Sequence, residues 1–206
     1  MTPSMPRHKL TNSFYRQSDV AQIAQQLLGR VLCTQTDEHT LTSGIITETE
    51  AYSGRADKAS HANDGCRTER TETMYRCGGI GYIYLCYGIH HLFNVVTNKK
   101  DQADAVLIRA VKPLEGTDTM LKRRSAGKLD PSLTAGPGRL TQALGITTQM
   151  DGVNLNGDTI WIEDRGSILA SNKIVAAPRI GVDYAGEDAK RPWRFYPQKS
   201  KWVSAK

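Results

Sequence analysis

The sequence predicts an α+β fold: a single domain with a curved, mostly antiparallel sheet flanked by helices. The chain has 206 residues, of which 39% are hydrophobic, and a chain of this size can bury one substantial core. Short apolar segments between polar turns are typical of antiparallel strands. The sequence contains no repeat and no linker. We therefore expect one domain over residues 18–206. Residues 1–17 are expected to form an N-terminal segment that can be flexible.

The first predicted element is a helix over residues 18–29. Ser18 or Asp19 can accept hydrogen bonds as its N-cap, and Gly29 can end it. Its apolar side chains recur every three or four residues, which places them on one face of a helix. They are Val20, Ile23, Ala24, Leu27 and Leu28.

Most of the remaining predicted elements are strands. The predicted strands cover residues 30–36, 41–52, 79–96 as a hairpin that turns near Gly88, 103–114 and 159–164. The polar residues 37–40 connect the first two strands, and two short helices are expected over residues 116–127 and 136–146. Residues 174–204 mix strand and loop. Residues 54–74 are polar and lack any period, and a loop of this length is more often functional than idle.

The composition argues against a membrane or secreted protein. The longest apolar runs are far shorter than a bilayer span, and the polar N-terminus lacks the apolar core of a signal peptide. We therefore expect a soluble intracellular protein with no membrane partner. The net charge is +6 and is concentrated in residues 121–128 and 190–202, where aromatic side chains accompany the second basic segment. Such a face suggests a nucleic acid partner, and an ordinary solvated surface is the alternative.

The four cysteines favour reduced thiols. Cys33, Cys66, Cys77 and Cys86 form no C-x-x-C pair, so their spacing fits neither a zinc ribbon nor an iron–sulfur cluster. A zinc site is the less favoured alternative, because metal sites usually have closer ligand pairs. Its candidate ligands are Cys66 or Cys77 with His61, His90 or His91.

The segment "ETEAY" places acids beside an aromatic side chain. In a strand the side chains alternate between faces, so Ile46, Glu48, Glu50 and Tyr52 should share one face. The strand "AVLIRAV" contains a single charge, Arg109, which must be paired if it is buried. A buried pair with one of the acids could be structural. It would also keep the carboxylate ionised, and an ionised carboxylate that faces a cavity can act as a general base.

Five aromatic side chains accompany this segment: Tyr52, His61, Tyr82, Tyr84 and Tyr87. Tyrosine is a good strand former, so each one taken alone could be ordinary core. Together with the acids and the basic surface, they suggest flat faces on which bases stack. Tyr82 and Tyr84 share one face of their strand, whereas Tyr87 has the opposite parity and lies near the turn.

Five blocks of the sequence resemble the motifs of the alkyladenine (3-methyladenine) DNA glycosylase family. They are "TETEAYSGRADKASH", "GYIYLCYGIHHLFNVV", "AVLIRAVKPLEG", "GPGRLTQALGI" and "RIGVDYAGEDAKRPWRFY", in this order. The resemblance extends from about Leu27 to Val203. It implies a monofunctional enzyme of base excision repair, which flips an alkylated purine out of duplex DNA and hydrolyses its N-glycosidic bond with an activated water. It implies no cofactor and no metal.

The resemblance also implies roles for individual residues. The second glutamate of the motif, Glu50, is the general base, Arg109 helps to hold the catalytic water, and the carbonyl of Ile180 completes the water site. Tyr87 wedges into the duplex and fills the gap left by the flipped nucleotide. The base-binding residues are Tyr52, His61 and Tyr84, which stack on the base, and Asn94, which contacts its edge.

Contacts to the DNA backbone are expected from the basic segments. The candidates are Arg67, Thr68, Arg70 and Arg139, the last near the helix start after Gly136. The family loop T-P-R-N reads Thr-Glu-Arg-Thr over residues 68–71, which puts its phosphate contacts in doubt. The implied partner is double-stranded DNA with damaged purines. We expect a monomer, cytoplasmic in a bacterium and nuclear in a eukaryote.

Three other functions compete with this one. A non-catalytic nucleic-acid-binding module on the same fold would bind without releasing a base. A hydrolase for free nucleosides would need similar acids and stacking faces, but neither the wedge Tyr87 nor a basic surface. A carbohydrate hydrolase would use Glu48 and Glu50 as a pair, and two residues on one strand face lie about 6.5–7 Å apart, which does not exclude it.

Overall fold

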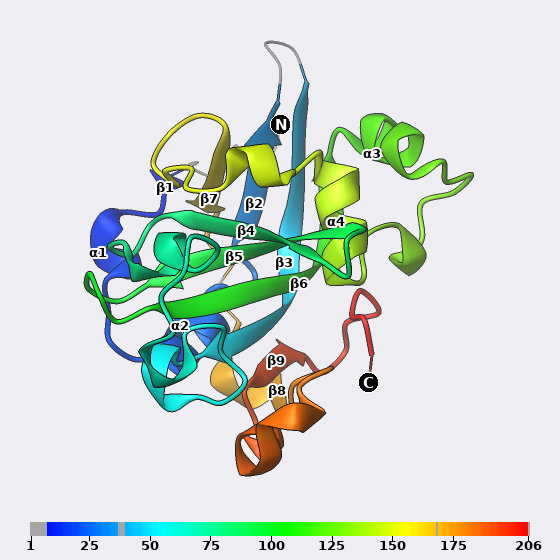
Figure 1. Cartoon of the computed structure of the whole chain (residues 1–206). Helices are drawn as coiled ribbons and strands as arrows, with labels where there is room; N and C mark the ends of the chain where they lie inside the picture. The colour runs from blue at the N-terminus through cyan, green and yellow to red at the C-terminus, as the bar shows by residue number, and fades with distance from the viewer. Residues whose placement is uncertain (1–7, 37–39, 168, 206) are drawn as a thin grey trace.

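A computed structural model describes residues 8–36, 40–167 and 169–205 of the chain. Within these residues nine strands form one sheet, and every strand pairing is antiparallel. Figure 1 shows that the sheet is curved, because strands β4, β5 and β6 cross the direction of β2 and β3 steeply. The predicted α+β fold with a curved, mostly antiparallel sheet is confirmed.

The strand order follows one path with a short branch. The order is β1-β7-β2-β3-β6-β5-β4, and β9 pairs with both β3 and β8. The strands are β1 (His8–Lys9), β2 (Val31–Gln35), β3 (Leu41–Tyr52), β4 (Gly81–Cys86), β5 (His90–Thr97), β6 (Asp104–Glu115), β7 (Ile160–Asp164), β8 (Ile174–Ala177) and β9 (Arg194–Pro197). The two longest strands, β3 and β6, lie side by side at the centre.

The helices are short and lie outside the sheet. The α-helices are α1 (Asn12–Tyr15), α2 (Val20–Gln26), α3 (Thr117–Arg124) and α4 (Pro137–Leu144). The 3-10 segments are Gly54–Ala56, Asn63–Gly65, Glu72–Tyr75, Pro131–Leu133, Thr148–Met150, Ser171–Lys173 and Asp183–Lys190. In α2 the predicted cap is confirmed: the Asp19 side chain accepts a hydrogen bond from the Gln22 amide at 2.9 Å. None of these described helices has the length and apolar character that a membrane span requires.

The N-terminal residues of the described chain pack against the sheet. β1 pairs with β7, and the side chain of Tyr15 is fully buried in the main core. Residues 8–17 of the predicted N-terminal segment therefore contact the domain. Residues 1–7 lie outside the described residues, as do residues 37–39 of the polar connection. The flexibility of the segment stays a prediction.

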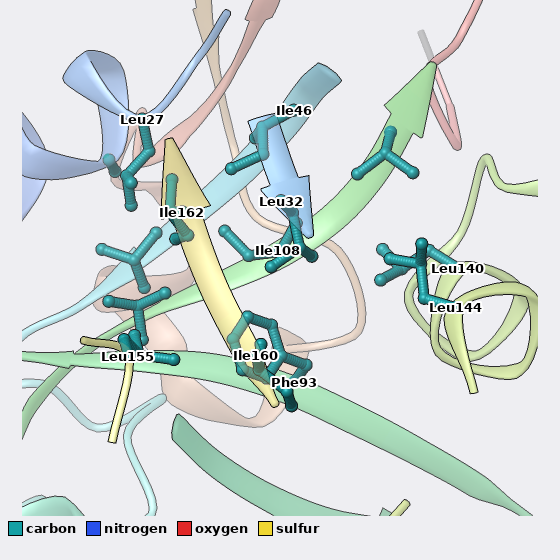
Figure 2. Close-up of a cluster of buried hydrophobic side chains, with 14 of the residues drawn as sticks. Leu27, Leu32, Ile46, Phe93, Ile108, Leu140, Leu144, Leu155, Ile160 and Ile162 are labelled. Carbon is teal, nitrogen blue, oxygen red and sulfur yellow. The ribbon is translucent and has the colours of Figure 1, made fainter. Parts of the chain in front are cut away.

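The central strand β3 contains a bulge that positions the acids. Its register against β6 shifts on both sides of Glu48, because Thr47 is an extra residue in β3 and Arg109 is an extra residue in β6. Ile46 packs into the main hydrophobic core (Figure 2). The prediction that Ile46 shares a face with Glu48 and Glu50 is therefore wrong, because the bulge interrupts the alternation between them.

The sheet separates two hydrophobic clusters. The main core fills the side that carries α2 and α4, and Figure 2 shows Leu27 at the end of α2 and Leu140 of α4 on its border. A smaller cluster on the other side joins Tyr82 of β4 to Met74 and Tyr75 of the loop between β3 and β4. This loop, predicted to be functional, therefore covers the sheet face opposite α2.

Candidate active site

A pocket of about 480 Å³ lies between the sheet and the loop that connects β3 to β4. Its walls come from β3, this loop, the β4–β5 hairpin, β6 and residues 180–184. Nine of the residues singled out from the sequence line it. They are Tyr52, His61, Arg70, Tyr82, Tyr84, Tyr87, Asn94, Arg109 and Ile180.

Glu50 is fully buried and lies directly behind this lining. Its Oε2 accepts hydrogen bonds from the Tyr52 hydroxyl at 2.9 Å and from Arg109 Nη1 at 3.1 Å. Its Oε1 accepts a hydrogen bond from the Ile180 amide at 2.8 Å. Ile180 thus contacts the carboxylate through its N–H, and the part that the resemblance implies for its carbonyl in the water site stays a prediction. Since all three partners line the pocket, Glu50 lies directly beneath its floor.

Arg109 joins the two acids of β3. Its side chain is only 8% exposed, and its Nε lies 3.4 Å from Glu48 Oε1 while its Nη1 contacts Glu50. Burial lowers the pKa of the guanidinium, but the charges of Glu50 and Glu48 outweigh this effect, so the pKa is raised. Arg109 is therefore a permanent cation, and the prediction that it pairs with the acids is confirmed.

Glu48 faces away from the pocket toward a second arginine. Its Oε1 accepts a hydrogen bond from Arg194 Nη1 at 2.9 Å, and its Oε2 accepts one from the Ser204 amide at 2.6 Å. It does not line the pocket. Glu48 and Glu50 therefore have different surroundings: they share Arg109, but only Glu50 also contacts Tyr52 and Ile180, which line the pocket. This arrangement argues against a carbohydrate hydrolase that uses both acids on one substrate.

Three aromatic rings meet on one wall of the pocket. Tyr82 and Tyr84 stack with their ring centroids 5.5 Å apart, as their shared strand face predicts. The His61 ring meets the Tyr84 ring edge-on, with the centroids 4.6 Å apart. His61 Nδ1 lies 3.0 Å from the Tyr82 hydroxyl, which fixes the orientation of the imidazole.

The charge state of His61 depends on its neighbours. Burial and, secondly, the positive charge of Arg70 lower the pKa of His61 to about 4. His61 is therefore neutral at pH 7. The Arg70 guanidinium lies over the Tyr84 ring, 5.1 Å from its centroid. Arg70 thus stands at the mouth of the pocket and contributes a positive charge there.

A buried ion pair connects the two sides of the pocket. The Asp57 carboxylate pairs with Arg179, and both side chains are fully buried. Asp57 also accepts hydrogen bonds from the Ser53 and Ala59 amides, so it fixes the loop that carries His61. Arg179 immediately precedes Ile180 and lies 4.7 Å from the centroid of the Tyr52 ring. This pair therefore fixes the positions of the His61 loop and of Ile180 relative to Glu50.

Tyr87 projects from the tip of the β4–β5 hairpin. Tyr87 and Gly88 both adopt positive φ, 51° and 73°, which is the pattern of a type I′ turn. A non-glycine residue in this conformation is unusual and can indicate a functional position. The Tyr87 side chain is 90% exposed, and Ile89 beside it is also exposed. The tip therefore presents an unpacked aromatic side chain at the rim of the pocket.

The remaining predicted residues lie at different distances from the pocket floor. Asn94 is buried in β5, and its amide nitrogen donates to the Tyr82 carbonyl at 3.2 Å. Arg67 forms ion pairs with Glu72 and Asp101 on the surface. Thr68 donates its amide to the Thr71 hydroxyl within the same loop. These two loop residues and Arg139 of α4 do not line the pocket.

The alternative zinc site has no ligand set in the described part of the chain. No three His, Cys, Asp or Glu side chains gather there in a way that could hold a metal ion. His61 instead contacts Tyr82, and the His91 ring accepts a hydrogen bond from the Thr148 amide at 3.2 Å. Cys66 and Cys77 are free and exposed.

Several residues of the site escaped the sequence analysis. Arg194 resembles Arg109 in being a charge within a strand of aromatic and apolar residues, and this signal could have identified it. Asp57 and Arg179 lie within the quoted motifs, but their pairing joins segments that are distant in the sequence. Ser204 has no sequence signal, because its role arises only from where the chain returns.

Comparison with known proteins provides the family. The model of the family described as "Methylpurine-DNA glycosylase (MPG)" matches residues 13–201. A Chlamydia abortus protein named "Putative 3-methyladenine DNA glycosylase" is 48% identical over 187 residues, which cover 90% of this chain and 96% of the relative. Proteins of the same name from Clostridium perfringens and Bacillus thuringiensis are 42% and 43% identical, covering 96% and 94% of this chain and 100% and 98% of the relatives.

Proposed function

The chain belongs to the methylpurine-DNA glycosylase family, and from this premise we propose that it is a 3-methyladenine DNA glycosylase that hydrolyses the N-glycosidic bond of alkylated purines in duplex DNA. One observation carries the proposal: a buried carboxylate, Glu50, receives three hydrogen bonds from residues that line an aromatic pocket. A base cannot reach such a floor from within the duplex, so the nucleotide is flipped into the pocket.

Glu50 is the general base. It takes a proton from a water molecule, whose oxygen attacks C1′ of the sugar while the electrons of the N-glycosidic bond leave with the base. The products are the free base and an abasic sugar. The developing positive charge on the sugar is stabilised by the same carboxylate. Arg109 and the Ile180 amide support this role because hydrogen bonds from both hold the Glu50 carboxylate in place beneath the pocket.

The pocket walls select electron-poor bases. Tyr52, His61 and Tyr84 provide ring faces, and a base with partial positive charge gains an attraction over such faces. Neutral His61 adds no opposing charge at pH 7. Asn94 contacts the edge of the base and disfavours the amino group of normal guanine by crowding it. We expect this selection to protect ordinary purines from excision.

The rim of the pocket engages the duplex. Tyr87 enters the stack and replaces the flipped nucleotide, which suits its exposed position on a tight turn. Arg67, Thr68, Arg70 and Arg139 contact the phosphate backbone. In the absence of DNA, Arg67 pairs with two acids, so DNA must compete with Glu72 and Asp101 for it. Binding therefore weakens as salt concentration rises.

The reaction uses no covalent intermediate and no cofactor. No lysine is among the residues that line the pocket in the described chain, so an amine nucleophile for lyase chemistry is missing there. We assign the enzyme to the cell interior, where its DNA substrate lies, and expect it to act as a monomer. A non-catalytic DNA-binding module is the alternative, and in it the buried Glu50 network would have a structural role only.

Base release from methylated duplex DNA tests the proposal. Wild type and Glu50→Gln are compared at low and moderate salt, and free bases are identified by chromatography. Release of 3-methyladenine by the wild type only, with DNA binding by both, is the expected result. Binding by both proteins without release would support the binding module instead. Release from free methylated nucleosides at the same rate as from duplex DNA would indicate a nucleoside hydrolase.

A further inference from the structure

The segment that follows β9 returns to the floor of the pocket. Ser204 Oγ lies 2.9 Å from Glu48 Oε1, and 3.2 Å and 3.4 Å from Nη2 and Nε of Arg109. A guanidinium can only donate, so the serine oxygen accepts from Arg109 and donates its own proton to Glu48. One hydroxyl group therefore bridges the arginine and the acid that stands behind it.

A second arginine holds this segment in place. Arg194 Nη1 donates to the Ala205 carbonyl at 2.9 Å and also to Glu48. The side chains of Arg109 and Arg194 are 8% and 7% exposed, and those of Glu48 and Glu50 are fully buried. The charges alternate in the order Glu50, Arg109, Glu48, Arg194. Buried charges are costly unless paired, so the balance of this row depends on each contact within it.

Two acids compete for Arg109. Its Nη1 contacts Glu50 at 3.1 Å, and its Nε lies 3.4 Å from Glu48. Glu48 already receives the Arg194 guanidinium and both the amide and the hydroxyl of Ser204. Because these donors satisfy the Glu48 carboxylate, Glu48 competes less strongly with Glu50 for the Arg109 guanidinium. If the hydroxyl were lost, Glu48 would lack a donor and Arg109 an acceptor, and both losses favour rotation of Arg109 toward Glu48.

We propose that Ser204 is a positioning residue for base excision: its hydroxyl group holds Arg109 in the orientation that serves Glu50. The inference rests on the proposed function, since Arg109 affects the reaction through Glu50. Ser204 does not line the pocket, so it acts without touching the substrate. Its contribution comes from a segment far along the chain, which must be seated before the pocket floor is complete.

The first test compares Ser204→Ala with Ser204→Thr, which keeps the hydroxyl group, in the full chain. Ser200→Ala is the matched control, because Ser200 lies in the same segment. Among the contacts described, its Oγ only accepts a hydrogen bond from the Trp202 amide, at 3.1 Å. Single-turnover base release is measured from pH 5 to 9, together with DNA affinity. We expect Ser204→Ala to lower the maximal rate about tenfold, the effect of losing one charge-assisted hydrogen bond.

The pH profile separates positioning from a merely structural role. A carboxylate with a less favourably placed cation is protonated more readily, so the acid limb of the Ser204→Ala profile should move to higher pH. DNA affinity should stay unchanged, and Ser204→Thr should restore the rate and the acid limb. A uniformly lower rate with an unmoved acid limb would overturn the proposal, as would a wild-type profile for Ser204→Ala. If Ser204→Ala did not fold, Ser204→Cys, whose thiol is a weak donor, would provide the same comparison.

A second measurement does not depend on activity. The Arg109 Nε–H signal is observed by NMR in the free protein and assigned by its loss in Arg109→Lys. We expect slow exchange with water in the wild type and in Ser204→Thr, and faster exchange in Ser204→Ala. Wild type that released no base would refute the proposed function, while this signal would still report whether Ser204 holds the guanidinium. Unchanged exchange in Ser204→Ala would overturn the inference itself.

Discussion

Replacing Glu50 with Gln should impair both folding and catalysis, because an amide cannot satisfy the donors that surround this position. Tyr52 and Arg109 share Oε2, and the Ile180 amide contacts Oε1. The tyrosine hydroxyl can reverse its role, but the guanidinium and the backbone amide can only donate. Either orientation of the Gln side chain therefore places its NH₂ group against another donor.

The structure sets the size of the expected effect. Removing one partner of a buried ion pair costs about 3–5 kcal/mol, and Glu48 remains as a second carboxylate for Arg109, so we expect about 3 kcal/mol. For a domain of this length, that corresponds to a fall in Tm of about 6–12 °C. Loss of a general base lowers a rate by about 10²–10⁴, and the lost charge also destabilises the transition state. We therefore expect base release to fall at least about 10³-fold.

The assay is single-turnover base release from methylated duplex DNA, with Tm measured by calorimetry on the same samples. Glu187→Gln is the matched control, because Glu187 is exposed and its ion pair with Lys190 lies on the surface. Such a pair contributes less than about 1 kcal/mol. A Glu50→Gln rate within about threefold of wild type would refute the general-base role. An unchanged Tm would refute the argument from its buried partners.

Three further predictions concern the pocket walls and the rim. The pKa of His61 is about 4 in the folded protein, because of burial and the charge of Arg70, and about 6.5 when unfolded. Between these pH values the unfolded chain binds one proton more than the folded protein. The free energy of unfolding should therefore decrease as pH falls from about 6.5 to 4, by up to about 1.4 kcal/mol per pH unit. Urea melts should show a flatter pH dependence for His61→Phe. Asp57→Asn should cost about 3–5 kcal/mol in thermal unfolding, because it leaves the Arg179 cation buried without its partner. Tyr87→Ala should leave Tm within about 2 °C but slow release from duplex DNA about 10–100-fold, with a smaller effect on single strands.

Each of these predictions has an outcome that contradicts it. An equal pH slope for His61→Phe and wild type would show that His61 is not held neutral. For Asp57, the control is Asp158→Asn, whose side chain is 96% exposed; equal unfolding temperatures for the two variants would contradict the role of the buried pair. Equal slowing of Tyr87→Ala on duplex and single-stranded DNA would mean that the side chain does not act as a wedge.

Local patterns in the sequence were sufficient for the main helices and strands after residue 17, but not for β1 and α1, and they were sufficient for most of the pocket. Residues two apart on a strand share a face, so Glu50 with Tyr52 and Tyr82 with Tyr84 could be grouped without a structure. The apolar surroundings of Arg109 indicated that it is buried and paired. The position of Tyr87 at the hairpin tip followed from Gly88, which indicated the turn, and from the spacing that separates Tyr87 from the strand face of Tyr82 and Tyr84. The functional assignment, however, depended on the resemblance of whole motifs to a known family.

Interactions between distant segments were decided only by the tertiary structure. The bulge at Thr47 places Ile46 in the core although alternation assigns it to the acid face, because one extra residue reverses every later side chain. The positions of Arg70 over Tyr84 and of Ser204 between Glu48 and Arg109 depend on how a loop and a terminal segment fold back. The sequence alone therefore determined which side chains share a face wherever a strand has no bulge. The fold determined which of these side chains interact with the same charged group. Coulomb and hydrogen-bond energies depend on distances in space, and these distances cannot be read from separation along the sequence.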